Sequence, residues 1–241
     1  AVGAAMWMVR LPQTAAWEAG EGIGRLGFAV ERVEVRGLER MTEHQIHEAA
    51  LAGDSLAMTN IDLTDIRARV EAIGWVRSAR VSRRLPDTLV IAIEERAPVA
   101  IWQHRGALTL IDIEGEPLGP IELDAMPDLP LIVGPGANRQ VAAYVALIDA
   151  APALRPMLEG ATWIGSRRWD LRFQSGEELA LPEGDEAAAR ALVRFARMDG
   201  VTGLLGEGFN RFDMRLPDRL VVRVPRERAR REAGEDPSEN I

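Results

Sequence analysis

The chain has 241 residues, 47% hydrophobic and 27% charged, and its formal net charge is −8 at pH 7. This composition is typical of a soluble globular protein with one large or two small domains, and it is too apolar for a disordered chain. The acidic balance and the lack of a Lys/Arg stripe argue against a nucleic-acid-binding surface, and the absence of cysteine excludes disulfides and thiolate metal sites.

Residues 1–27 are predicted to precede the first folded unit. Ala1 to Val9 is apolar, but a bilayer span needs roughly 20 such residues. The segment is either an unstructured leader or the outer end of a membrane helix. Residues 22–27 read GIGRLG, a literal GxGxxG. We assign it no nucleotide role, because a dinucleotide-binding loop follows a strand and opens a helix, whereas this one follows a polar segment and precedes a strand.

Residues 28–97 are predicted to form one unit with the order strand, helix, helix, strand, strand. Residues 31–36 alternate valine with charged side chains, which indicates a strand. Thr42 and Gln45 form a capping box that predicts a short helix after them. Asp62 predicts the start of a second helix, which carries apolar residues at helical spacing and ends at Gly74.

A β-hairpin is predicted to close this unit. Residues 77–84 alternate polar and apolar side chains, and Leu-Pro-Asp at 85–87 is a turn sequence. Residues 88–94 form the return strand, with alternate apolar side chains on one face. Pro98 marks where pairing in this sheet ends.

Residues 98–225 are predicted to form a second, β-rich unit with two or three helices, so the fold class is α+β. Its strands are expected at residues 99–103, 108–111, 117–118, 131–133, 169–173, 178–181, 211–216 and 219–224. One helix is expected to begin at an Asn138 cap, and another to run from an Asp185 cap to Asp199, with Gly200 as its stop.

The last two predicted strands repeat the hairpin pattern. Residues 214–225, MRLPDRLVVRVP, again give strand, Leu-Pro-Asp turn, apolar strand and proline. Residues 226–241 are charged, lack aromatics and are expected to be disordered. Since no folded chain is expected after the second hairpin, its last strand is predicted to lie at a sheet edge.

Candidate chemical groups do not assemble into a catalytic or metal-binding set. His44 and His47 lie at i, i+3 on a predicted helix, but no third ligand is close in sequence. Ser166 lacks the second glycine of a nucleophile elbow. The acidic residues cluster at turns and strand ends, and the tryptophans fit core or rim packing. We therefore predict no catalytic residue, no cofactor and no metal.

Several segments together resemble the FtsQ/DivIB family of bacterial cell-division proteins. The first unit, which opens with FAVERVEVRG at 28–37 and continues with WVRSARV at 75–81, looks like a POTRA domain. The resemblance continues with ERAPVAIW at 95–102, LIDIEG at 110–115 and FDMRLP at 212–217. The order and spacing of these segments, more than any single one, carry the resemblance.

The resemblance implies a non-enzymatic, single-pass inner-membrane protein with its bulk in the periplasm. Residues 1–27 would be a membrane-helix remnant and linker, 28–97 the POTRA domain, 98–225 the β-domain and 226–241 the tail. It also implies that the β-domain binds the small division proteins FtsB and FtsL, and that the POTRA domain recruits other division proteins. Together these partners would regulate septal peptidoglycan synthesis.

The partner-binding residues are predicted at the last strand and beside it. They are Arg167, Arg215, Leu216, Leu220, Val221, Val222, Arg223 and Val224. An edge strand offers unpaired backbone groups to a partner strand, the mode called β-augmentation. Arg215 is the candidate for a charge-assisted bond to a partner carboxylate. Some family members carry aromatic residues where this chain has Leu216 and Val224, so the side-chain contacts need not match theirs.

Two other classes of protein remain as alternatives. A POTRA-containing component of an outer-membrane secretion or assembly system would need many long alternating strands after the POTRA unit, and too few residues follow it. A periplasmic hydrolase would need a nucleophile and a base within reach of each other.

Overall fold

The computed structural model describes residues 28–53, 55–216 and 219–225, together with Glu18. The chain separates into two compact units, which divide between Ala97 and Pro98. The predicted membrane-helix remnant and the predicted disordered tail lie outside the described residues, as do Pro217 and Asp218 of the last turn. Within the described ranges, no helix combines the length and apolar character that a bilayer crossing requires.

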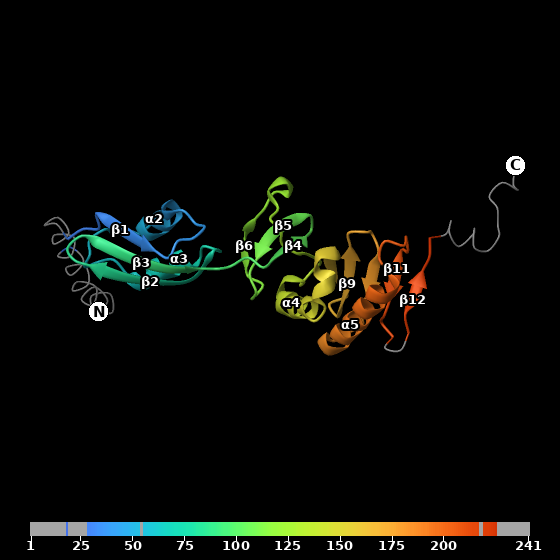
Figure 1. The fold of residues 1–241 in the computed structure, drawn as a ribbon. Coiled ribbons are helices and arrows are strands. Elements are labelled where there is room, and N and C mark those ends of the chain that lie inside the picture. The colour runs from blue at the N-terminus through green and yellow to red at the C-terminus, as the bar shows by residue number, and fades with distance from the viewer. Residues whose placement is uncertain (1–17, 19–27, 54, 217–218, 226–241) are drawn as a thin grey trace, which may run out of the picture. The chain divides into compact units, whose positions relative to one another are not determined.

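The first unit has the predicted order of strand, helix, helix, strand, strand (Figure 1). Its elements are β1 (Arg32–Arg36), α2 (Glu43–Leu51), α3 (Leu63–Glu71), β2 (Val76–Arg84) and β3 (Thr88–Glu95). The sheet order is β1-β3-β2, with β1 parallel and β2 antiparallel to β3. The central strand is therefore β3, and β1 and β2 are the two edges.

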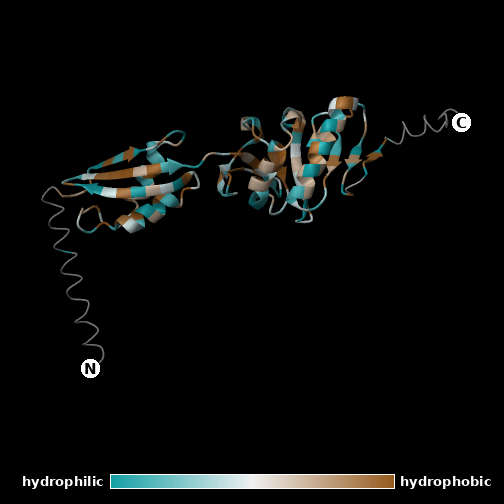
Figure 2. Ribbon diagram, turned by 60° about the horizontal axis from the view of Figure 1, so that its bottom comes forward, coloured by the Kyte–Doolittle hydropathy of each residue, from teal (hydrophilic) through white to brown (hydrophobic). Residues whose placement is uncertain are grey.

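β3 is central because its alternate side chains fill the core of this unit. Leu89, Ile91 and Ile93 are 1%, 0% and 8% exposed. They pack with Ile46 of α2 and Val70 of α3, and Figure 2 shows hydrophobic residues along this strand. Burying one face of the hairpin against two helices is what the period-two alternation predicted.

The two helices differ from prediction in detail. α2 begins directly after Thr42, but the Thr42 side chain makes no capping hydrogen bond, so the predicted capping box is not formed. α3 is capped as predicted, because Asp62 accepts hydrogen bonds from two backbone N–H groups at its start. This helix ends at Glu71, three residues before Gly74.

The second unit is built on one nine-stranded mixed sheet. Its strands are β4 (Ala100–His104), β5 (Ala107–Ile111), β6 (Pro117–Pro120), β7 (Leu131–Val133), β8 (Leu158–Ile164), β9 (Arg168–Phe173), β10 (Glu178–Ala180), β11 (Arg211–Asp213) and β12 (Val221–Arg223). The order across the sheet is β12-β11-β10-β9-β8-β7-β4-β5-β6. This confirms a β-rich second unit after the strand-helix-helix-strand-strand unit.

Helices α4 (Val141–Asp149) and α5 (Asp185–Thr202) cover one face of this sheet (Figure 1). Short 3₁₀ turns also occur at Leu123–Ala125, Asn138–Gln140 and Pro152–Met157. The core lies between the helices and the sheet, where Tyr144 contacts Trp169, and Phe195 contacts Phe173 and Phe212, at ring-centroid distances of 5.1 to 5.8 Å. Burial raises the pKa of Tyr144 to about 12.

β8 is a strand that the sequence reading did not predict. It pairs parallel with β7 and antiparallel with β9, in the middle of the sheet. Apolar and polar residues do not alternate in its sequence, LEGATWI, because both faces of the strand are partly buried. Gly160 permits a close approach there, since a Cβ at this position would lie 2.9 Å from the Leu131 carbonyl oxygen.

Asn138 does not cap α4 as predicted. The helix begins at Val141 after a 3₁₀ turn, and the Asn138 Nδ2 group donates to the Gly115 carbonyl at 3.0 Å. Gly115 has a φ of 82°, and a Cβ there would lie 2.4 Å from the Asn138 carbonyl oxygen. The Asn138 side chain therefore links two loops by a hydrogen bond instead of capping α4.

α5 begins and ends differently from prediction. Its N-cap is Gly184, and Asp185 is the first helical residue. The helix continues through Gly200, which tolerates a helical position at a cost of about 1 kcal/mol relative to alanine. It ends at Gly203, whose φ of 62° is the left-handed conformation that glycine adopts readily.

Candidate partner-binding site

β12 is the outermost strand of the second unit. In the described part of the chain it pairs with β11 alone, and the two strands are antiparallel. Both strands are shorter than predicted, covering 211–213 and 221–223. The described sheet thus ends at the last strand of the second hairpin, which is the edge position that the sequence predicted.

The hydrogen bonds of β11 show which of its residues face β12. In a strand, the N–H and C=O groups of one residue point to the same side, and those of the next residue point to the other. The Met214 N–H donates to the Ala180 carbonyl of β10, whereas Asn210, just before β11, bonds on both sides, with its carbonyl to β10 and its N–H to Arg223. Since Met214 and, two residues earlier, Phe212 face β10, Arg211 and Asp213 direct their backbone groups toward β12.

The same alternation assigns the backbone groups of β12. Arg223 lies opposite Arg211, and Val221 lies opposite Asp213. Arg223 faces β11, because its carbonyl accepts the Asn210 N–H at 2.9 Å. The N–H and C=O of Val222 consequently point to the open side of the sheet. The sequence alone did not determine this parity, that is, which residues of β12 direct their backbone groups to the open side and which direct them to β11.

The side chains of the last strand alternate as predicted. Leu220 and Val222 are partly buried against the core, whereas Val221 is 53% exposed and Arg223 is exposed. Val224 is half-buried, and Leu216 before the turn is 56% exposed. A strand added outside β12 would therefore meet an apolar Val221 on one face of the sheet.

A concavity of about 760 Å³ lies beside this hairpin, and we call it the arginine pocket. Its charged lining residues are Arg167, Arg168, Arg190, Arg194, Arg215 and Glu183. The structure therefore brings together two of the predicted partner-binding residues, Arg167 from the β8–β9 turn and Arg215 from the end of β11. Arg167, Arg168, Arg190 and Arg215 form ion pairs with Glu183, Asp170, Glu186 and Asp213 respectively. The N–H groups that these pairs leave over can bind an anionic occupant, because arginine has five.

Arg215 is held in place by Asp213. Its Nε and Nη2 atoms donate to the Asp213 carboxylate at distances of 2.6 to 3.0 Å. The hydrogen bond from Arg215 is the main cause that lowers the pKa of Asp213. The guanidinium is thus oriented by a carboxylate of its own chain, and it retains further N–H groups, since arginine has five.

Three arginines of the pocket were missed by the sequence reading. Arg190 and Arg194 lie one helical turn apart on α5, a spacing that places both on one face. Arg168 belongs to β9 and donates to Asp170 at 3.1 Å. The i, i+4 spacing on α5 was a usable signal, but only the fold shows that this face of the helix lies beside Arg215.

Each of the other sheet edges in the described ranges is blocked at one or more points by a proline or a side chain. β6 begins and ends with proline, which has no N–H to offer a partner strand. On β1, the His47 Nε2–H group donates to the Val33 carbonyl at 3.1 Å. On β2, the Glu71 carboxylate accepts the Ala79 N–H at 3.0 Å. For β12, no such side chain or proline is found among the described residues.

The other candidate groups have structural roles in this fold. His47 bonds to β1, and His104 stacks on Trp102 at 5.3 Å. Ser166 lies in the tight turn between β8 and β9, with a φ of 57°. In the part of the chain that the structure describes, no group of three or more His, Asp or Glu side chains is placed to hold a metal ion.

Two family models match the chain. One, described as Cell division protein FtsQ/DivIB, C-terminal, matches residues 100–215, and the other, described as POTRA domain, FtsQ-type, matches residues 28–96. The first match covers β4 to the end of β11, and the second covers the whole first sheet with its helices. Both matches include the residues that form the described cores.

Curated relatives named Cell division protein FtsQ are similar over most of the chain. The relative from Zymomonas mobilis is 49% identical over 214 residues, which are 89% of this chain and 67% of that protein. The relative from Novosphingobium aromaticivorans is 48% identical over 199 residues, 83% of this chain and 62% of that protein. The relative from Caulobacter vibrioides is 37% identical over 197 residues, which are 82% of this chain and 65% of that protein. The chain thus spans about two thirds of the length of these relatives.

Proposed function

Because the chain belongs to the FtsQ/DivIB family of cell-division proteins, we propose that it is a non-enzymatic scaffold of the division machinery that binds FtsB and FtsL through β12. In this proposal the protein is anchored in the inner membrane by a single helix and the two folded units lie in the periplasm. Binding of the partners helps to regulate septal peptidoglycan synthesis. The first unit, the POTRA domain, recruits other division proteins.

The observation that carries this proposal is the open edge at β12. Of the sheet edges in the described ranges, β12 is the one on which no outward backbone group is found to meet a proline or a side chain of the same unit, whereas each other edge is blocked at one or more points. In a protein that does not use it, an open sheet edge promotes aggregation, because its unpaired backbone groups can pair with a strand of another chain. Such an edge is favourable in a protein that receives a partner strand.

The arginine pocket supports the same proposal and adds a chemical requirement for the partner. A strand on β12 brings its neighbouring residues close to Arg215, and charge-assisted bonds of arginine to carboxylate are stronger than neutral ones. The partner segment is therefore expected to carry Asp or Glu beside the residues that pair with Val222. Binding should weaken as salt concentration rises, because the exposed charges are screened.

A pull-down tests the proposal directly. The tagged chain is incubated with the periplasmic parts of FtsB and FtsL from the same bacterium, and bound protein is quantified. We expect both partners to be retained, and retention to fall when Val222 is replaced by proline. A parallel peptidoglycan hydrolysis assay is expected to show no activity. Equal retention by the chain and by Val222→Pro would overturn the β12 site, and hydrolysis would overturn the scaffold function.

A further inference from the structure

The exposed large hydrophobic residues of the first unit gather at one end of it. Among the described residues of this unit they are Phe28, Leu51, Leu56 and Leu85, which are 38%, 42%, 46% and 64% exposed. Leu51 is the last residue of α2, Leu56 lies in the loop before α3, and Leu85 lies in the turn between β2 and β3. We call these four residues the apolar end. Exposed apolar side chains that gather from separate segments mark an interaction surface.

Backbone hydrogen bonds bring these segments side by side. Residues 28–30 and 56–58 are joined by two hydrogen bonds of 2.8 Å. Two N–H groups at and just before the start of β1 donate to the Asp87 carbonyl, in the turn after Leu85, at 3.2 and 2.9 Å. The apolar end is therefore the end at which the described chain enters the first unit (Figure 1).

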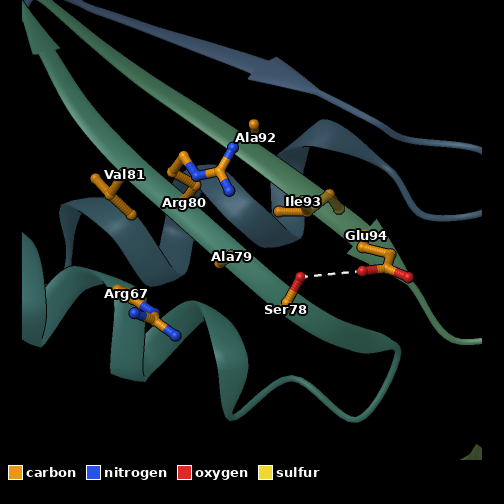
Figure 3. Close-up of a pocket in the computed structure, with 8 residues that line it drawn as sticks. All are labelled: Arg67, Ser78, Ala79, Arg80, Val81, Ala92, Ile93 and Glu94. Carbon is orange, nitrogen blue, oxygen red and sulfur yellow. Dashed lines mark hydrogen bonds between the residues drawn. The ribbon is translucent and has the colours of Figure 1, made fainter.

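The rest of the first unit has a different surface. Along β2, a concavity of about 440 Å³ has polar and charged groups in its lining, among them Arg67, Ser78 and Glu94 (Figure 3). At the opposite end of the unit, Leu38 and Ile73 are partly buried against the core. Exposure of large apolar side chains is thus a property of one end of the unit and not of its whole surface.

The arginines at the apolar end are already bonded within the unit. Arg32 pairs with Asp87 at 2.9 Å, and Arg84 pairs with Glu34 at 2.5 Å. Arg83 donates to a backbone carbonyl before α3. Charge therefore does not mark this end as a site for an anionic partner. Its affinity for a partner would depend mainly on the apolar area that the contact removes from water.

A lipid bilayer fits the apolar end better than a protein partner does. The four side chains belong to a helix end, a loop, a turn and the first described segment, whereas peptide partners usually add to a strand edge or lie in a groove. The concavity between Leu51 and Leu56 is about 190 Å³, and typical ligand pockets have about 300–1,000 Å³. The interface of a bilayer needs no matching groove, because it takes up apolar side chains wherever they are presented.

The bilayer is also close to this end along the chain. The inference rests on the proposed anchor, a single membrane helix whose outer end is predicted at residues 1–9. Residues 10–27 join that segment to Phe28, and 18 residues reach no more than about 65 Å. Tethering at this distance raises the effective concentration of the apolar end at the bilayer surface, so weak apolar contacts are sufficient for binding.

We propose that the apolar end is a membrane-contact site, which seats the POTRA domain on the bilayer that anchors the protein. Leu85 and its three neighbours enter the layer between the lipid headgroups and the acyl chains. Arg83 and Arg84, beside Leu85, keep their guanidinium groups at the level of the headgroups, because a long arginine side chain can lie along an apolar surface. The contact does not require anionic lipid, and it is separate from the proposed pairing at β12.

Fluorescence from a single labelled position tests this contact. The chain has no cysteine, so Leu85→Cys can carry one nitrobenzoxadiazole dye. The full chain is tethered by an N-terminal histidine tag to phosphatidylcholine vesicles that contain a nickel-chelating lipid, so the tag replaces the anchor. We expect the emission to rise about threefold on tethering, because the dye moves from water into an apolar layer. Nitroxide-labelled lipids should quench it, and added salt should leave it nearly unchanged, since apolar contacts are not screened.

An exposed leucine of the second unit provides the matched control. The same dye at Leu123, which is 76% exposed, should not respond to tethering. If Leu85→Cys does not fold, a dye at Leu56 is expected to respond in the same way. With the dye at Leu56, Phe28→Ser combined with Leu85→Ser should roughly halve the rise, because less apolar area enters the bilayer.

Three outcomes would overturn the proposal. An equal rise at Leu123 would show non-specific adsorption, and no rise at Leu85 or Leu56 in the folded, tethered chain would show that this end does not touch the bilayer. High emission before vesicles are added would show that another segment of the chain covers this end. The tag replaces the anchor and neither FtsB nor FtsL is present, so these results are independent of the pairing at β12, which the pull-down tests in solution.

Discussion

Single residues order loops in this fold, and Glu95 at the end of β3 is the clearest case. Its carboxylate accepts the backbone N–H groups of Glu39, Arg40 and Met41 at 2.8 to 3.1 Å. Burial raises the pKa of Glu95, but the three backbone hydrogen bonds together with Arg40 outweigh it, and the pKa is lowered. The sequence reading placed this residue only among the charges at strand ends.

Replacing Glu95 by alanine is expected to destabilise the POTRA domain by about 1.5–3 kcal/mol, the range for hydrogen bonds to a charged group. Because its pKa is lower in the folded than in the unfolded state, its contribution is complete above about pH 4.3 and is lost as pH falls through the folded pKa. Urea unfolding at pH 7, 5 and 3 measures this. The wild-type chain should lose more stability than Glu95→Ala between pH 5 and 3.

The neighbouring Glu94 provides the control, since it is exposed and, among the described residues, its side chain accepts one hydrogen bond, from the Ser78 hydroxyl at 3.2 Å. Glu94→Ala should change the free energy of unfolding by less than about 0.5 kcal/mol, as surface substitutions usually do. A similar loss in both variants would show that the three hydrogen bonds to Glu95 contribute no more than a surface charge.

Arg215 makes a second prediction at this scale. Arg215→Ala should weaken FtsB binding by about 1–3 kcal/mol, the scale of a hot-spot contact. Stability should change by less than about 1 kcal/mol, because the Arg215–Asp213 pair is half-exposed. Calorimetry and thermal unfolding measure the two quantities. Arg155→Ala, which also breaks an ion pair but does not line the arginine pocket, is the control and should bind normally. Normal binding by Arg215→Ala would remove this residue from the site.

At the scale of elements, the parity of β12 sorts proline substitutions into two classes. Val222→Pro removes an N–H that points to the open side, so it should weaken FtsB binding by about 1–3 kcal/mol and leave the thermal midpoint nearly unchanged. Val221→Pro removes an N–H that points to β11, so it should lower the midpoint by about 4 °C or more. Calorimetry and circular dichroism measure the two effects.

The two variants control for each other, because they are adjacent valines on one strand. If Val221→Pro is the folded variant that loses binding, the hydrogen-bond parity is the reverse of the one assigned here. If both fold and both bind normally, the partner does not add a strand at β12.

Much of the element order could be predicted from the sequence, because the signals were local. The alternation of residues 88–94 and the Asp62 cap predicted β3 and the start of α3 without knowledge of the fold. The failures have a common cause, since tertiary contacts override local preference. Asn138 donates to the Gly115 carbonyl instead of capping α4. β8 lies between β7 and β9, so its residue pattern reflects contacts with both neighbouring strands rather than a local preference.

The candidate site was predictable only in part, for the same reason. The edge position of the last strand followed from chain order, and Arg167 and Arg215 were chosen as separate residues. Nothing in the sequence showed that they line one pocket with Arg190 and Arg194, because these residues come from three elements up to 48 positions apart in the numbering. The closing roles of His47 and Glu71 were likewise invisible, since both act across the fold on strand backbones.

At the scale of the whole molecule, the two units are expected to fold independently. Each has its own sheet and its own buried core, and the chain divides between Ala97 and Pro98. A chain of residues 28–97 should therefore unfold in one cooperative transition, monitored by circular dichroism in urea. A broad, non-cooperative transition would show that the POTRA domain depends on the β-domain. The matched piece, residues 98–225, should also unfold cooperatively.

The position of β12 has a consequence for how the protein is made. Synthesis runs from the N-terminus, and β12 is both the last described strand and the outermost strand of its sheet. The central strands β7, β8 and β9 are complete before the ribosome reaches it, so the core can form while the partner surface is still missing. A chain cut short by a premature stop or clipped by a protease before residue 221 would keep most of its core but lack the pairing strand. Under the proposed pairing at β12, recruitment would thus require that synthesis has passed residue 223.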